Sequence, residues 1–150
     1  GWGRGVGWFL TSIAISLKYM DNSLKEYKTI RETFKSVAIS AMEYQHQDGL
    51  FKWSLLAHKG PVDTSASAMI LYAMALGINL GIIDPCYRGA VKKGYNAFEP
   101  YIKDGKVTQA MGDCRGFAMY PQFEYGPYPW SNAFFLLLDS EIRNWGEYKS

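Results

Sequence analysis

The sequence has few of the residues that form cross-links or metal centres. It contains two cysteines and two histidines, and none of them lies at metal-ligand spacing from another. So few cysteines do not define a disulfide framework, and we interpret Cys86 and Cys114 as free thiols of a reducing, cytoplasmic compartment. His46 and His58 are isolated in the sequence. We therefore expect no zinc site, and no residue pattern calls for another metal or a cofactor.

Strong charge and long apolar runs are also absent. The formal net charge is +2, and no basic run exceeds two residues. This excludes the usual signs of a nucleic-acid binder and of a polybasic membrane patch. No apolar stretch reaches the ~18 residues of a transmembrane helix. No signal peptide is visible, but the chain does not begin with Met and starts inside a motif, so we expect further sequence upstream.

The composition is that of a globular domain rich in aromatic residues. The chain has 150 residues, of which 48% are hydrophobic and 20% charged, which suits one domain over residues 1–150. Aromatic residues make up 16%, with 11 Tyr, 8 Phe and 5 Trp. Such a content fits a protein that stacks on ring-shaped ligands, and it equally fits an ordinary aromatic core.

The first eight residues alternate glycine with larger side chains. Glycine occupies every odd position, and Trp2, Arg4, Val6 and Trp8 occupy the even ones. An extended chain would place these four side chains on one face and bare backbone on the other. Two indoles beside a guanidinium suit a sugar ring that carries a carboxylate. The alternative is a glycine-rich turn with two tryptophans in the core.

Hydrophobic spacing predicts a helical protein. We expect helices over residues 8–20, 24–45 and 130–144, one from a cap at Asp63, Thr64 or Ser65 to about Leu80, and one from about Cys86 to Ile102. Residues 50–55 are predicted to be extended, 103–106 to form a hairpin-like turn and 108–129 to form a long ordered loop. The inward positions are predicted to be Ile30, Phe34, Val37, Ala41 and Tyr44 in the second helix, and Phe134, Leu137, Leu138 and Ile142 in the last.

A weak internal repeat indicates a helical array. The segment Ser12-Ile13-Ala14-Ile15-Ser16 recurs as Ser36-Val37-Ala38-Ile39-Ser40, and a tyrosine follows each copy. Similar core demands on successive helices produce such a repeat by chance as well. Helices joined by alternating short and long loops favour an α/α toroid or solenoid.

Four segments resemble one enzyme family, in the same order along the chain. Residues 2–8 resemble the WGRGxGW signature of the unsaturated glucuronyl and rhamnogalacturonyl hydrolases, glycoside hydrolase families 88 and 105. Residues 44–51, 64–69 and 77–84 resemble the YQxxDGLW, (T)SASAM and GVxLGxLD segments of the same families. The likeness covers residues 1–102 well. Residues 109–130 match poorly, where these families have a glycine-rich active-site loop.

The resemblance implies an all-α fold, about half of an (α/α)6 six-hairpin barrel with short extended hairpin segments. This chain is similar to the C-terminal half, and the upstream half is absent from it. These enzymes act on oligosaccharides that end in an unsaturated uronic acid: an aspartic acid protonates the C4=C5 double bond, water adds, and the hemiketal collapses. Trp2, Arg4 and Trp8 match substrate-pocket positions, with Arg4 on the sugar acid and the tryptophans against the ring.

The catalytic aspartate of these families lies well upstream of the signature and has no counterpart here. Asp48 and Asp84 match turns, where turn and cap chemistry is the expected role, and Asp63 is not a transferable substitute either. Asp113 lies in the loop that should face the pocket, so it is the candidate for a catalytic acid in this chain.

Two other functions remain open from the sequence. One is a sugar-binding module without chemistry, built on Trp2, Arg4, Trp8 and the loop aromatics Phe117, Tyr120, Phe123, Tyr125, Tyr128 and Trp130. The other is a structural helical module in which every aromatic residue is core. Residues 120–129 fit either a pocket rim or a rigid lid. Half a toroid exposes an apolar face, so we expect a homodimer or a complementing chain to complete it.

Overall fold

The helices and strands are those of a computed structural model that describes residues 1–57, 59–113 and 124–145. Its main helices are α1 (Gly3–Tyr19), α2 (Lys25–Met42), α3 (Thr64–Asn79), α4 (Arg88–Asn96) and α5 (Pro129–Ile142). Short 3-10 helices span Pro85–Tyr87, Glu99–Tyr101 and Arg143–Trp145. Strands β1 (Ile102–Lys103) and β2 (Lys106–Val107) form one antiparallel pair, and β3 (Ala110–Met111) and β4 (Tyr125–Gly126) form another.

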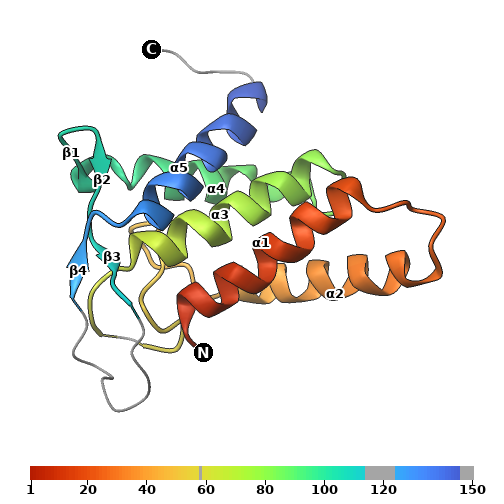
Figure 1. The fold of residues 1–150 in the computed structure, drawn as a ribbon, viewed down its shortest axis with the longest axis horizontal. Coiled ribbons are helices and arrows are strands. Elements are labelled where there is room, and N and C mark those ends of the chain that lie inside the picture. The colour runs from red at the N-terminus through yellow and green to blue at the C-terminus, as the bar shows by residue number, and fades with distance from the viewer. Residues whose placement is uncertain (58, 114–123, 146–150) are drawn as a thin grey trace.

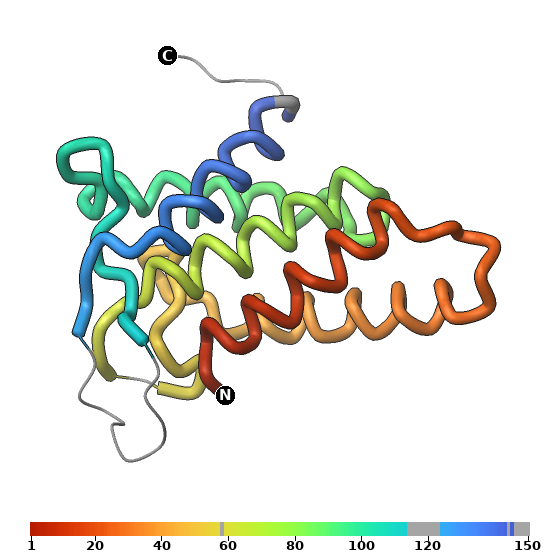
Figure 2. The backbone as a smooth tube through the Cα atoms, viewed as in Figure 1, coloured from red at the N-terminus to blue at the C-terminus, as the bar shows by residue number. Residues whose placement is uncertain are grey.

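The helices form two layers. Helix α3 packs between α1 and α5, and α2 and α4 run in the opposite direction on the outside of this row (Figure 1). The N-terminal ends of α1, α3 and α5 lie at the same end of the molecule, beside β3 and β4 (Figure 2). This alternation of inner and outer helices is the one expected for part of an (α/α)6 toroid. None of the described helices is long and apolar enough to cross a membrane.

Helix α3 is the centre of the core. Every residue from Thr64 to Ile78 is buried, because helices pack on several sides of it. Its many small residues, mainly alanine and serine, allow that close approach. Asp63 is the N-cap, with its side chain accepting a hydrogen bond from the Ser65 backbone N–H at 2.9 Å. The predicted helix and its cap are thus confirmed.

The N-terminal octapeptide is largely helical, so the extended arrangement considered from the sequence does not form. Only Trp2 is extended, and α1 begins at Gly3. A Cβ on Gly3 would lie 2.6 Å from the Lys52 carbonyl oxygen, and one on Gly7 would lie 2.7 Å from Met69 Cβ. Glycine at these positions therefore lets the start of α1 pack directly on α3 and on the loop that precedes α3. The bare glycine backbone thus packs against other parts of the same chain.

Other differences concern where elements end. The second helix is shorter than predicted, at Lys25–Met42, and Tyr44 is exposed beyond it. The fourth predicted helix is divided into a 3-10 helix, α4 and a second 3-10 helix. Helix α4 ends at Asn96, because Pro100 has no backbone N–H to donate to the Asn96 carbonyl. In α5, Leu138 and Ile142 are buried as predicted, but Leu137 is 41% exposed.

The three predicted non-helical segments differ in outcome. The turn at 103–106 is confirmed: Asp104 and Gly105 have φ of 50° and 71°, as in a tight hairpin between β1 and β2. Residues 50–55 form no strand, only isolated bridges that pair Lys52 with Val62 and Trp2 with Ser54. The predicted loop of residues 108–129 contains β3 and β4, and its part from 114 to 123 lies outside the described residues.

Candidate functional site

The first turns of α1 and α5 form two walls of a pocket of about 340 Å³. Its lining residues are Trp2, Arg4, Trp8, Asp113 and Trp130. The structure thus brings together the three side chains that the sequence assigned to a substrate pocket. It also places Asp113, the candidate acid, in the same pocket. Trp130 is the one loop aromatic among the described residues that joins them.

Arg4 is a buried cation at the wall of this pocket. Its side chain is 5% exposed. Its Nη1 donates to the Met111 carbonyl and its Nη2 donates to the Gly112 carbonyl at 2.7 Å. No carboxylate among the described residues lies within ion-pair distance of it. A guanidinium has five N–H donors, so Arg4 keeps N–H groups and its full charge for a ligand.

Two indoles stabilise the Arg4 charge. The Arg4 Cζ atom lies 5.2 Å from the Trp2 ring centroid and 5.0 Å from the Trp130 ring centroid. Both distances are within the range of cation–π attraction. The Trp130 ring is itself held in place, because it stacks on Tyr128 at 4.8 Å and its Nε1 donates to the Met111 carbonyl at 3.3 Å.

Trp8 presents an exposed indole to the pocket. It lies one helical turn after Arg4 on α1, and it is 45% exposed. The edge-on contact with Phe134, at 5.4 Å and 85°, fixes the Trp8 ring against α5. Phe134 in turn packs on Tyr72 of α3 at 5.9 Å. An exposed and fixed aromatic face is the kind of surface on which the apolar face of a sugar ring stacks.

Trp2 is positioned by the loop that precedes α3. The Gly3 backbone N–H donates to the Trp53 carbonyl at 2.7 Å, and the Leu55 N–H donates to the Gly1 carbonyl at 3.0 Å. These bonds hold the chain extended at Trp2, which is the N-cap residue of α1. Trp2 Nε1 is buried, and no described residue accepts a hydrogen bond from it.

The helix ends add to the preference for an anion. The pocket lies at the N-terminal ends of α1 and α5, whose first turns contribute Arg4 and Trp130. Helix N-termini carry partial positive charge from unpaired backbone N–H groups. Together with the Arg4 guanidinium, which has no carboxylate partner among the described residues, they favour a negatively charged ligand group.

The aspartates have separate roles in the structure. Asp48 Oδ1 accepts from the Leu50 backbone N–H at 2.9 Å, and Asp84 Oδ1 accepts from the Cys86 N–H at 2.8 Å. The latter bond lowers the pKa of Asp84 below its ordinary value. These are the turn and cap roles expected for them. Asp113 is exposed and lines the pocket.

Sequence reasoning missed the backbone that holds Arg4. The carbonyls of Met111 and Gly112 lie more than a hundred residues further along the chain than Arg4, and no sequence pattern marks a carbonyl as an acceptor. Of the predicted loop aromatics, Tyr125 belongs to β4 and Tyr128 is the N-cap residue of α5, and neither lines the pocket. Phe117, Tyr120 and Phe123 lie outside the described residues, as does Cys114.

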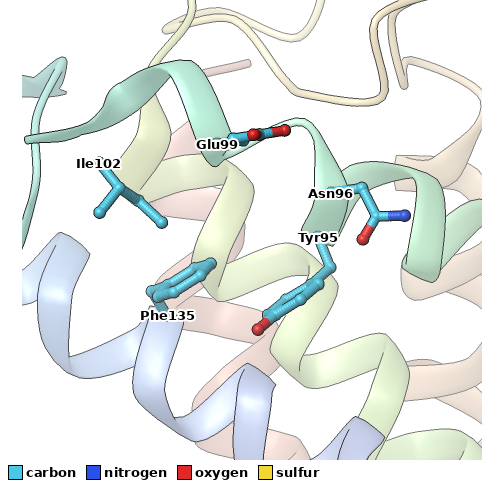
Figure 3. Close-up of a pocket in the computed structure, with 5 residues that line it drawn as sticks. All are labelled: Tyr95, Asn96, Glu99, Ile102 and Phe135. Carbon is cyan, nitrogen blue, oxygen red and sulfur yellow. The ribbon is translucent and has the colours of Figure 1, made fainter. Parts of the chain in front are cut away.

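A second, larger hollow lies away from this pocket. Its volume is about 590 Å³, and its walls are Tyr95, Asn96, Glu99, Ile102 and Phe135 (Figure 3). Tyr95 and Phe135 stack at 5.2 Å with nearly parallel rings. Among the described residues that line it, Glu99 alone is charged, and its carboxylate disfavours an acidic ligand. Within the described ranges, no group of three His, Cys, Asp or Glu side chains could hold a metal ion.

The sequence matches one family model and resembles two hydrolases. The sequence model of Glycosyl Hydrolase Family 88 matches residues 1–145. An unsaturated 3S-rhamnoglycuronyl hydrolase from Formosa agariphila is 33% identical over 116 residues, which are 76% of this chain and 28% of that protein. A protein of the same name from an Alteromonas species is 29% identical over 112 residues, 71% of this chain and 27% of the relative.

Solved structures share the fold. A possible member of glycoside hydrolase family 105 from Salmonella enterica superposes with a TM-score of 0.85 at 18% identity, over 97% of this chain and 40% of that one. A family 88 glycosyl hydrolase from Bacteroides vulgatus gives 0.80 at 25% identity, over 93% and 42%. The chain thus spans well under half the length of these proteins, and its helices form part of an (α/α)6 toroid. The chain belongs to glycosyl hydrolase family 88.

Proposed function

We propose that this chain provides the sugar-acid subsite of a carbohydrate hydrolase that acts on oligosaccharides ending in an unsaturated uronic acid. The observation that carries the proposal is the buried Arg4 guanidinium, which has no carboxylate partner among the described residues and lines a pocket with indole walls. The similarity to proteins named unsaturated 3S-rhamnoglycuronyl hydrolase supports the same substrate class.

The carboxylate and the ring of such a sugar residue match the guanidinium and the indoles of the pocket. Its carboxylate binds the remaining N–H groups of Arg4, because a guanidinium pairs well with a planar carboxylate. Its ring, flattened around the C4=C5 double bond, lies against the exposed face of Trp8. The low polarity that the indoles create around Arg4 strengthens the charge pairing relative to open water.

The reaction that fits this substrate is hydration of the double bond. A proton adds to C4, water adds to C5 and returns a proton to the enzyme, and the resulting hemiketal opens to release the next sugar. Asp113 is the acid that we propose to test in this chain, because its carboxyl group lines the same pocket as Arg4. The alternative source of the proton is a carboxyl group outside this sequence.

Turnover of an unsaturated uronyl disaccharide tests the activity directly, because hydration removes the ultraviolet absorbance of the double bond. Loss of absorbance with the purified chain, abolished in Asp113→Asn, supports Asp113 as the acid. Binding without loss of absorbance supports a subsite whose acid comes from elsewhere, or a sugar-binding module without chemistry. No binding at all contradicts the proposal.

The role of Arg4 has a matched control in this chain. Arg88 also lies over an indole, with its Cζ 5.3 Å from the Trp145 ring centroid, but it is exposed and outside the pocket. Arg4→Met should weaken binding of the acidic disaccharide by tenfold or more, about the loss expected when a charged hydrogen-bond partner is removed. Arg88→Met should leave it unchanged. If Arg4→Met unfolds the chain, Arg4 has a structural role. Arg4→Lys, which keeps the charge, would then be used to measure the contribution of Arg4 to binding.

We also propose that a second helical body completes the toroid. Large apolar side chains are exposed on both edges of the inner row of helices, namely Ile15 and Tyr19 on α1 and Leu136 and Leu137 on α5. Exposed apolar surface of this kind marks an interaction site, and this chain corresponds to 40% of the Salmonella structure. Light scattering that gives a homodimer supports completion by a second copy. A strictly monomeric chain contradicts that form and leaves a complementing chain or further sequence of the same protein.

A further inference from the structure

We propose that Asp63 is a positioning residue that sets Arg4 in place through the backbone of Met111. The inference rests on the proposed function, because it concerns how the subsite for the sugar acid is held. It assigns to a buried carboxylate, which the sequence identified only as a helix cap, a second role at the pocket.

Asp63 makes more hydrogen bonds than a helix cap requires. It is fully buried, and its Oδ1 accepts from the Ser65 backbone N–H at 2.9 Å and from the Ser65 hydroxyl at 2.6 Å. The same oxygen accepts from the Met111 backbone N–H at 3.1 Å. The first two bonds cap α3, whereas the third reaches to β3, far along the chain.

Met111 connects this carboxylate to the pocket. While its N–H is bound to Asp63, its carbonyl accepts from Arg4 Nη1 and from Trp130 Nε1. Both of these side chains line the pocket. Met111 is fully buried and lies in a strand of two residues. Besides Asp63, the Gly112 N–H, which donates to the Glu124 carbonyl at 2.7 Å, fixes the peptide that carries the Met111 carbonyl. A shift of Met111 would therefore move the acceptor of Arg4 and of Trp130 together.

The second oxygen of Asp63 shows that capping alone does not explain the carboxylate. Asp63 Oδ2 is buried, and no described residue donates a hydrogen bond to it. An unpaired buried oxygen of this kind is costly. A serine would cap α3 about as well and would bury no such oxygen. A serine side chain, however, would be too short to accept a hydrogen bond from the Met111 N–H. This additional hydrogen bond is what the longer aspartate side chain provides.

Two variants of Asp63 separate the cap from the contact with Met111. Asp63→Ser keeps an oxygen that caps α3 but is too short for the Met111 N–H, whereas Asp63→Asn keeps the cap and the reach with a weaker, neutral acceptor. The matched control is Asp84→Ser, which changes an aspartate cap that lies outside the pocket. Binding of an unsaturated uronyl disaccharide and of its carboxyl-reduced counterpart is measured for each by calorimetry. The indole N–H signal of Trp130 is followed by nuclear magnetic resonance in the absence of ligand.

The expected result is a folded Asp63→Ser with about tenfold weaker binding of the acidic disaccharide, the size of one charged hydrogen bond. Binding of the reduced disaccharide should change less, and the Trp130 indole signal should shift. Asp63→Asn should recover most of the affinity, and Asp84→Ser should match the wild type. Wild-type affinity and an unmoved Trp130 signal in Asp63→Ser would overturn the inference.

The experiment distinguishes this inference from the proposed function. If the wild-type chain binds neither disaccharide, the proposed function fails, but the Trp130 signal still reports whether Asp63 sets the geometry around Met111. If Asp63→Ser does not fold, Asp63→Asn decides alone through the Met111 amide. Faster exchange of that amide with solvent, together with a shifted Trp130 signal, supports the inference, and unchanged values for both overturn it.

Discussion

The indole of Trp2 lies over Gly5, so closely that a Cβ atom on Gly5 would be 2.8 Å from Trp2 Cε3. Gly5 is helical, so the glycine is needed there for space and not for an unusual backbone angle. Its bare surface lets Trp2 fold back along α1 and reach the Arg4 guanidinium. This one contact explains why a side chain just before the helix can take part in the pocket.

Gly5→Ala should displace Trp2 and weaken carbohydrate binding. The added methyl group meets the indole, and the half-buried Trp2 can move toward solvent, so the fold should survive. We expect a changed tryptophan fluorescence spectrum and a several-fold weaker affinity for the acidic disaccharide, the result of losing up to ~1 kcal/mol of cation–π and stacking energy. Unchanged affinity with a displaced indole would show that Trp2 does not contribute to binding.

Gly7→Ala and Gly89→Ala should change stability in opposite directions. A Cβ on Gly7 meets Met69 Cβ at 2.7 Å, and an atom so close to the backbone cannot move aside cheaply. Overpacking of this kind lowers the free energy of unfolding by ~1–3 kcal/mol. A methyl group added to Gly89, in the first turn of α4, would meet no described neighbour within 4 Å. Alanine there should raise the free energy of unfolding by up to ~1 kcal/mol through helix propensity.

Urea unfolding of both glycine variants provides the comparison, with each replacement adding the same methyl group to a helix. A stabilised Gly7→Ala would contradict the conclusion that the glycines of the N-terminal motif serve close packing of α1 on α3.

Ser131→Ala should loosen the junction between α3 and α5. Ser131 Oγ lies 3.0 Å from Thr64 Oγ1, and both residues are fully buried. Thr64 Oγ1 also donates to the Thr108 carbonyl at 2.7 Å, so the remaining hydroxyl stays paired after the change. We expect a loss of ~1 kcal/mol in the free energy of unfolding. The control, Ser140→Ala on the exposed side of α5, should stay within ~0.5 kcal/mol of the wild type.

Tyr125→Phe should protect the protein in alkaline solution. Burial, and then the negative charge of Asp63, raise the pKa of Tyr125 to about 12, from an ordinary value of 10.0. The folded state therefore resists formation of the phenolate, and this contribution to stability is complete below pH 10 and is lost as the pH rises toward 12. Phenylalanine cannot ionise, so the variant should lose less stability than the wild type over that interval.

Chemical unfolding at a series of pH values checks the Tyr125 prediction. Burial also raises the pKa of Tyr72, so Tyr72→Phe is measured in parallel to separate the two contributions. Identical pH profiles for Tyr125→Phe and the wild type would contradict the prediction.

Much of the helical architecture could be read from local patterns. Apolar residues spaced by three and four predicted α2 and α5, and Asp63 before a run of small and apolar residues predicted the start of α3. Such signals are local because helical periodicity and N-capping involve residues only a few positions apart. The motif of Trp2, Arg4 and Trp8 likewise identified side chains that share a pocket.

The sequence by itself thus determined the approximate positions of the main helices, the family and three of the pocket residues. The tertiary structure alone decided how the N-terminal glycines are used. The alternating pattern is also compatible with an extended chain, and the close contacts with Met69 and Trp53 are what require glycine in a packed helix. It also decided what holds Arg4. The acceptors are backbone carbonyls of Met111 and Gly112, and every residue has a carbonyl, so only the packing of distant segments selects which ones a buried guanidinium meets.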